Sequence, residues 1–189
     1  MEKSQTRKTI PILILSVFAV TVSAAELPRA QTILVNKMSK EAGISLAERR
    51  QIVSSLASDP DADWEQDRAS ELRYFRVSLS VHRTDGILVS SHASQDCGAT
   101  GNCPVWLFKS GGGRVKLILS NAFADRIGIQ NSTNHGLRNL VLWANQSAQT
   151  SEVDVFTFDG ERYLRSRCFQ AKGDGTSPGE VRVMKCPAR

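Results

Sequence analysis

The sequence predicts an α+β fold that is mainly β, with one antiparallel sheet built from two similar hairpin units and two N-terminal helices packed on it. Apolar residues recur every three or four positions between residues 28 and 58, which is typical of helices. From residue 74 onward, short runs of strand-forming residues alternate with turns rich in Gly, Asn or Ser.

The first 25 residues have the three parts of a secretory signal peptide. Lys3, Arg7 and Lys8 form a basic head, residues 10–22 are almost continuously apolar, and residues 22–25 supply the small side chains of a cleavage site. The alternative is an uncleaved membrane anchor, but a spanning helix needs about 20 apolar residues and this run is shorter. We therefore expect cleavage of residues 1–25, no membrane span afterwards, and a periplasmic or secreted chain.

Residues 26–60 are predicted to form a helical segment with two helices. In the first, apolar residues share one helical face: Ala30, Ile33, Leu34, Met38 and Ala42. Gly43 is a plausible end for this helix, and Ser45 with Glu48 forms the capping box of the second. The second helix should end at Asp59, because the residue before a proline avoids the helical conformation.

Residues 61–189 are predicted to form one disulfide-stapled β domain. Residues 74–81 alternate between apolar and polar side chains, and similar short runs follow at residues 86–90, 105–108, 115–119, 126–130, 137–143, 153–158, 163–168 and 181–184. The acidic stretch at residues 59–63 lacks the glycine and glutamate positions of an EF-hand, so we expect a linker there and no metal or cofactor.

An internal echo at an offset of fifty residues runs through this domain. Residues 76–79 return as 126–129, residues 86–87 as 136–137, and residues 105–108 as 155–158. A glycine-rich turn follows each aromatic pair, and the second, Asp159-Gly160, is a strong hairpin signal. The recurrence predicts two similar multi-stranded units.

Four cysteines in an exported chain predict two disulfides, and three pairings are possible. We favour the local pairing of Cys97 with Cys103 and Cys168 with Cys186 over the crossed pairings, since each bridge then closes a hairpin-sized loop. A redox or zinc site is the competing interpretation. The Cys-x5-Cys spacing fits neither a thiol oxidoreductase nor a zinc knuckle.

Three motifs between residues 75 and 169 carry a resemblance: Cys97-Gly98-Ala99-Thr100-Gly101-Asn102-Cys103, Gly136-Leu137-Arg138-Asn139-Leu140 and Phe158-Asp159-Gly160-x-x-Tyr163. This stretch resembles small exported bacterial proteins of unassigned function, and is distantly similar to the four-stranded repeats of integrin-type β-propellers. In propellers the Asp-Gly turn binds calcium. Residues 82–86 and 132–136 hold only one carboxylate between them, so calcium binding is not expected, and two units are too few to close a propeller.

A cationic strip is predicted near the C-terminus. On a strand, Tyr163, Arg165 and Arg167 share one face, and Arg162 precedes them. Such a strip suits carboxylate or phosphate groups of an envelope polymer or an acidic partner protein. The alternative is an edge strand whose charges prevent aggregation.

The composition narrows the possible functions. A net charge of +5 without a concentrated basic face argues against nucleic-acid binding. His82, His92 and His135 could serve acid–base catalysis, but no Gly-x-Ser-x-Gly motif is present and turn histidines are usually solvated. We expect a non-enzymatic envelope module that binds or inhibits a partner protein or an anionic polymer. The alternative is a small secreted or periplasmic hydrolase that uses histidine chemistry.

Overall fold

The computed structural model describes residues 26, 29–38, 43–60, 62, 64, 66–83, 85–92, 96–173 and 180–187. The predicted signal peptide, and residues 61 and 63 of the acidic stretch at residues 59–63, lie outside the described residues. In the described part of the chain, no helix has the length and apolar character that crossing a membrane requires.

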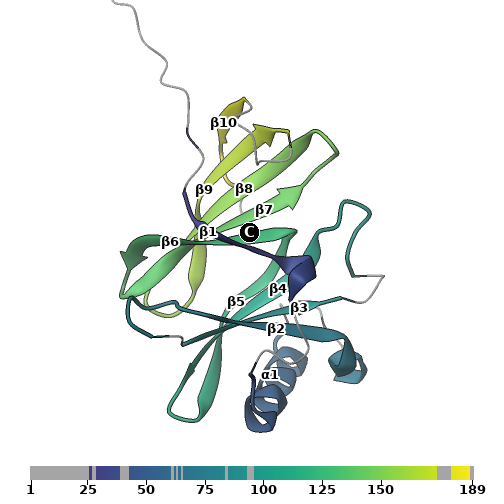
Figure 1. Ribbon diagram of the computed structural model, residues 1–189, viewed down its shortest axis with the longest axis vertical. Coiled ribbons are helices and arrows are strands. Elements are labelled where there is room, and N and C mark those ends of the chain that lie inside the picture. The colour runs from purple at the N-terminus through teal and green to yellow at the C-terminus, as the bar shows by residue number, and fades with distance from the viewer. Residues whose placement is uncertain are drawn as a thin grey trace, which may run out of the picture.

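In the described part of the chain, ten strands form two antiparallel sheets (Figure 1). The six-stranded sheet has the order β1-β6-β7-β8-β9-β10, and the four-stranded sheet has the order β2-β3-β4-β5. The strands are β1 Gln31–Leu34, β2 Leu72–Val77, β3 Gly86–Ser91, β4 Cys103–Gly111, β5 Arg114–Ala124, β6 Arg126–Asn134, β7 Leu137–Asn145, β8 Thr150–Phe158, β9 Tyr163–Lys172 and β10 Val181–Met184. Only Asp125 separates β5 from β6, so the chain passes from one sheet to the other without a loop.

The alternation of side chains along the strands produces three apolar clusters. In β3, Leu88 belongs to the cluster between the two sheets, whereas Ile87 and Val89 belong to the cluster beneath the helix. In β7, Leu142 also lies between the sheets, whereas Val141 lies in the cluster on the outer face of the six-stranded sheet. Because strand side chains alternate between faces, the central strands of both sheets are apolar on both sides.

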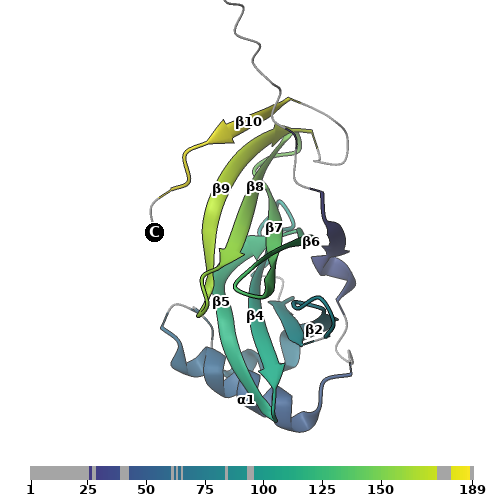
Figure 2. The same ribbon diagram turned by 90° about the vertical axis from the view of Figure 1, so that its left-hand side faces the viewer.

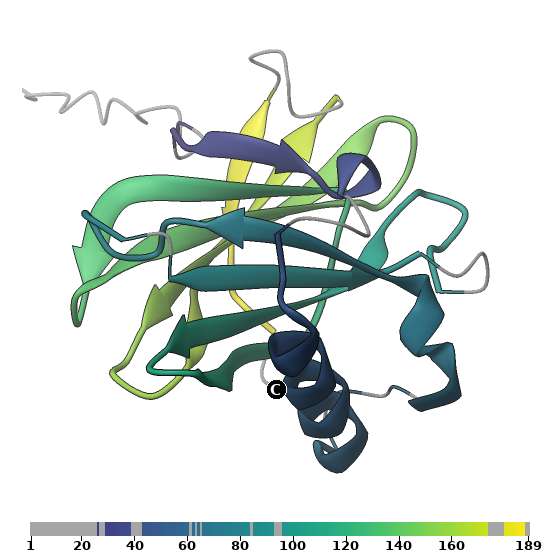
Figure 3. The same ribbon diagram turned by 60° about the horizontal axis from the view of Figure 1, so that its bottom comes forward.

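Helix α1, Leu46–Ser58, packs on the outer face of the four-stranded sheet (Figure 3). The predicted capping box is present: Ser45 Oγ accepts from the Glu48 backbone N–H at 3.2 Å, and the Ser45 backbone N–H donates to Glu48 Oε2 at 3.0 Å. Ile52 and Leu56 are the fully buried residues of this helix. Seen from the side, α1 lies at one end of the molecule and β10 at the other (Figure 2).

The predicted arrangement of two helices on one sheet is wrong. The first predicted helix contains instead β1 and a short 3-10 helix, η1 (Val35–Lys37). Residues 31–34 pair with β6, with Ile33 opposite Ile127, and Val35 is buried in the core. Backbone pairing with a distant strand has therefore overridden a local spacing that also suits a helix. A second 3-10 helix, η2 (Gln66–Glu71), precedes β2.

The prediction of a single sheet is also wrong, because the two multi-stranded units lie in separate sheets. The chain forms one four-stranded meander, β2 to β5, and then a second, β6 to β9. The segments of the fifty-residue echo fall on β2 and β6, on β3 and the start of β7, and on β4 and β8. β1 and β10 extend the second meander at its two edges.

The predicted local disulfides are confirmed. Cys97 pairs with Cys103, and Cys168 pairs with Cys186. The second bridge ties β9 to the segment that follows β10, next to the register pair of Cys168 with Met184.

Candidate functional site

A groove with a volume of about 360 Å³ separates the edge strands of the two sheets. One wall comes from β1 and its neighbours in the six-stranded sheet, and the other from β2 and the turn that follows it. The lining residues are Gln31, Ile33, Phe75, Arg76, Val77, Ser78, Val81, His82, Arg83, Ile129 and Arg138. This inter-sheet groove therefore brings three arginines and a histidine together, and no carboxylate is among the described residues that line it.

Arg138, the second residue of β7, is held at the groove by its backbone. Its N–H donates to the Leu79 carbonyl at 2.7 Å, and its own carbonyl accepts from the Tyr163 hydroxyl at 2.6 Å. Burial, and then the negative charge of Asp85, raise the pKa of Tyr163 well above its ordinary value, so the hydroxyl keeps the proton that it donates. Arg138 Nε is buried and has no hydrogen-bond partner among the described residues.

The carboxylate of Asp85 shapes the turn that carries Arg83. Asp85 Oδ1 accepts from the backbone N–H groups of Leu79 and Ser80, each at 3.2 Å, and Oδ2 accepts from Ser80 Oγ at 2.8 Å. A bridge between Ser80 and Arg83 closes the turn. The turn thus presents Val81, His82 and Arg83, all exposed, at one side of the groove, while the nearby carboxylate is occupied by the backbone and Ser80.

Arg76 adds no uncompensated charge, because its guanidinium binds Glu48 Oε1 and Oε2 at 2.9 and 2.8 Å. Burial of Glu48 works against its ionised form, but hydrogen bonds from Ser45, Arg76 and Ser110 outweigh burial and hold the pKa of Glu48 at about 2. Among the described residues, no carboxylate forms an ion pair with Arg83 or Arg138. These two residues therefore set the charge of the groove, and a guanidinium suits phosphate and carboxylate oxygens.

The residues of the predicted cationic strip have three different environments. Arg162 is exposed in the turn between β8 and β9, where its backbone N–H donates to Asp159 Oδ1 at 2.8 Å. Tyr163 is buried, with 1% of its surface exposed. Arg165 is half-buried and forms ion pairs with Asp154 at 2.9 Å and Glu152 at 3.5 Å.

Arg165 and Arg167 lie on opposite faces of the sheet because the pairing of β8 with β9 is irregular. Phe156 lies opposite Arg165, and its neighbour Val155 lies opposite Arg167. Neighbouring residues of a strand face opposite sides, so the extra residue, Ser166, separates the two arginines. The guanidinium of Arg167 lies 6.0 Å from the ring of Phe169, on the outer face.

The three histidines occupy separate places. His82 is exposed beside the inter-sheet groove, and His135 is exposed in the turn between β6 and β7, with φ 46°. His92 is half-buried; burial and then the charge of Arg73 lower its pKa, against a hydrogen bond with the backbone of Val35. In the part of the chain that the structure describes, no hydrogen bond joins any two of them, and no group of three or more metal-ligating side chains could hold an ion.

The cysteine-bracketed loop at residues 97–103 joins the two sheets. The side-chain amide of Asn102 donates to the Asn145 carbonyl at 2.8 Å, and its Oδ1 accepts from the Asn145 backbone N–H at 2.8 Å. Through the Asn102 side chain, the loop therefore bonds to both backbone groups of Asn145 at the end of β7, as a neighbouring strand would. The loop itself leads into β4 of the other sheet. The Asn145 side chain adds a bond to the Thr100 carbonyl at 3.2 Å.

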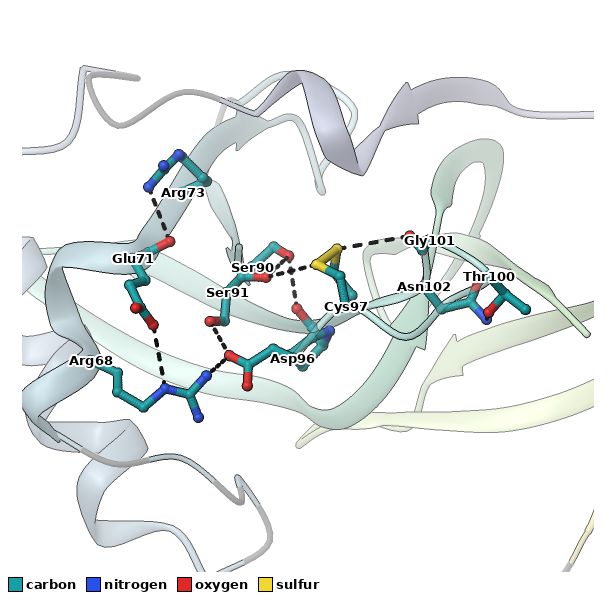
Figure 4. Close-up of a disulfide and its surroundings, with 12 residues drawn as sticks. Arg68, Glu71, Arg73, Ser90, Ser91, Asp96, Cys97, Thr100, Gly101 and Asn102 are labelled. Atoms are coloured by element: carbon teal, nitrogen blue, oxygen red, sulfur yellow. Dashed lines mark hydrogen bonds and ion pairs between the residues drawn. A yellow bond between two sulfur atoms is a disulfide. The ribbon is translucent and has the colours of Figure 1, made fainter. Parts of the chain in front are cut away.

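The other end of this loop is fixed by Asp96 (Figure 4). Its carboxylate accepts from Ser91 Oγ and forms an ion pair with Arg68, which also contacts Glu71 at 3.4 Å. Ser91 is fully buried, so its hydroxyl has a structural partner and is not presented to solvent. The loop is therefore a structural connection between η2, β3 and β7.

Sequence reasoning did not find the inter-sheet groove. Arg83 and Arg138 are far apart in the sequence and belong to different sheets, so no local pattern joins them. Arg138 lies in the quoted motif at residues 136–140, but nothing in its neighbourhood indicated a role for its side chain.

No protein-family model, curated protein or solved structure matches the chain. Function is therefore inferred from the residues themselves.

Proposed function

We propose that this chain is an exported, non-enzymatic module that binds a phosphate or carboxylate group of an anionic envelope polymer in the inter-sheet groove. The observation that carries the proposal is the guanidinium of Arg138. Its Nε is buried without a hydrogen-bond partner among the described residues, and Arg138 lines, together with Arg83, a groove where no described lining residue is acidic.

An anion in the groove would supply what Arg138 lacks. A buried donor without an acceptor costs about 1–3 kcal/mol, and more when the group is charged. A phosphate or carboxylate can accept two parallel N–H bonds from one guanidinium, so Arg83 and Arg138 together can hold one anionic group from two sides. Phe75, which is 39% exposed, adds an apolar surface that suits the ring of a sugar beside that group.

The fold supports binding more than chemistry. Arg138 is positioned through backbone bonds, and Arg83 is carried on a turn fixed by Asp85. Rigid donors lower the entropic cost of capturing a ligand. The two disulfides and the basic, apolar start of the sequence support export to an oxidising compartment.

Calorimetric titration of the processed chain with three purified probes tests the proposal: lipopolysaccharide and teichoic acid, which carry phosphate, and soluble peptidoglycan fragments, which carry carboxylates. Replacing Arg83→Gln and Arg138→Gln together should weaken binding at least about 100-fold, since each removes a charge-assisted bond of about 1.5–3 kcal/mol. The probe that binds identifies the source of the anion.

The control variant replaces two exposed arginines of the predicted strip, Arg162→Gln and Arg167→Gln, and so loses the same net charge as the groove variant. We expect this variant to bind within about threefold of the parent, and thermal melts should show that both variants remain folded. Loss of binding in the control but not in the groove variant would assign the site to the strip. If none of the three probes binds the parent chain, the proposal is wrong.

A further inference from the structure

A second groove, with a volume of about 930 Å³, runs along helix α1 on the outer side of the four-stranded sheet. Its helical wall includes Leu46, Arg50, Val53 and Ala57, which recur at the spacing of one helix face. The lining residues extend over the full length of α1, whose 13 residues span about 20 Å at 1.5 Å per residue. The opposite wall comes from η2 and β2.

Small or apolar side chains form most of the middle of this α1 groove. Val53, Ala57 and Ala69 are small side chains, and buried Leu72 and Tyr74 contribute to the β2 wall. At the start of α1, Leu46 is 64% exposed beside the groove. An apolar face with small central residues allows another backbone to lie close to α1.

The charge of the α1 groove is confined to the N-terminal half of the helix. Arg49 and Arg50 are the charged residues among those that the structure describes along the groove. Arg49 is fixed over the Tyr74 ring at 5.2 Å, and its Nε donates to the Ile44 carbonyl at 3.3 Å. Arg50 is exposed, and the nearby carboxylate of Glu48 binds Arg76 and Ser110.

The β2 wall of the α1 groove consists of side chains. Leu72 and Tyr74 reach the groove from the face of the sheet that α1 covers, so the groove presents no backbone ladder that an extended peptide could join. A helix satisfies its own backbone groups and needs only a complementary side-chain face. The shape therefore favours a helical occupant.

We infer that the α1 groove docks a helical segment of a partner protein, about three turns long, with a small and apolar face and with carboxylates at the end that lies beside Arg49 and Arg50. The length follows from α1, the face from Val53, Ala57 and Ala69, and the acidic end from the two arginines. This docking surface is separate from the inter-sheet groove and does not depend on the function proposed for it.

Two synthetic helical peptides of about 14 residues serve as probes. They share one Ala- and Leu-rich face, and one carries Glu in its first turn where the other carries Lys. Amide chemical shifts of the processed chain, recorded by NMR during titration, should move at Val53, Ala57 and Ala69 with the acidic peptide. The acidic peptide should bind at least about tenfold more tightly than the basic one.

Three variants of α1 place the interaction. Ala57→Arg obstructs the groove from an exposed position, and Arg50→Glu reverses the charge of the groove at that position. Each variant should weaken binding of the acidic peptide at least about tenfold. Arg50→Glu should also improve binding of the basic peptide. Ala47→Arg changes an exposed position of the same helix outside the groove and should leave binding unchanged. Equal binding of the two peptides, shifts centred elsewhere, or no binding of the acidic peptide at about 1 mM would overturn the inference.

Discussion

Replacing Asn102→Ala tests whether the cysteine-bracketed loop holds the two sheets together. The change removes two hydrogen bonds of 2.8 Å between the Asn102 side chain and the backbone of Asn145, and one of 2.9 Å to Thr100 within the loop. It leaves the part-buried N–H and carbonyl of Asn145 without these partners. Each lost bond contributes about 1 kcal/mol net, and an unsatisfied buried group costs about 1–3 kcal/mol.

Water can reach part of this contact, so we expect a loss of about 2–3 kcal/mol in the free energy of unfolding. Urea unfolding monitored by tryptophan fluorescence measures it, with the disulfides intact and the dependence on urea compared between variants. Asn102→Asp keeps the acceptor for the Asn145 N–H but loses the donor, so its loss should be smaller than that of Asn102→Ala. A loss below about 0.5 kcal/mol for Asn102→Ala, the range of ordinary surface substitutions, would refute a connecting role for the loop.

Three further predictions concern stability and the groove. Glu48→Gln should lower the free energy of unfolding by about 2–3 kcal/mol at pH 7. Because the folded pKa of Glu48 is about 2 against an ordinary 4.5, the wild type has this extra stability above pH 4.5 and loses it as the pH falls towards 2. Urea unfolding at several pH values should therefore show the stabilities of the two chains converging at low pH, whereas a constant difference would contradict the assignment. Gly128→Ala should destabilise the chain by about 1–3 kcal/mol, because the added methyl carbon would lie 2.8 Å from the Trp143 ring. The loss should appear as a lower melting temperature, and an unchanged melting temperature would show that the ring moves freely. Tyr163→Phe removes the bond to the Arg138 carbonyl and should cost about 1 kcal/mol and weaken anion binding severalfold in the calorimetric titration, while binding equal to that of the parent would mean that Arg138 is positioned without it.

The parts of the fold that depend on local chemistry could be predicted from the sequence. The capping box of Ser45 and Glu48 places the start of α1, because both bonds form within four residues. The disulfides join cysteines that are 6 and 18 residues apart, which turn-forming residues can bring together. The strands from β3 to β9 also follow from alternation and turns, since these signals act within each hairpin.

What the sequence did not reveal depends on contacts between distant segments. Residues 31–34 have a spacing that suits a helix, and only their pairing with β6 makes them a strand. The extra residue at Ser166 turns Arg165 and Arg167 to opposite faces, and an irregularity of that kind is set by the partner strand. Arg83 and Arg138 line one groove only because two sheets pack together, so the inter-sheet groove has no signature in either segment.

The direct passage from β5 into β6 at Asp125 leaves one residue to join the two sheets. Asp125 is itself bound on both sides, since its N–H donates to the Trp143 carbonyl at 2.9 Å and its carbonyl accepts from the Val35 N–H at 2.9 Å. The chain therefore crosses between the two sheets at a residue whose backbone N–H and carbonyl are both hydrogen-bonded, with no loop between β5 and β6. If the inter-sheet groove binds an anionic group as proposed, a joint of this kind favours small groups over larger ones whose binding would require the sheets to separate.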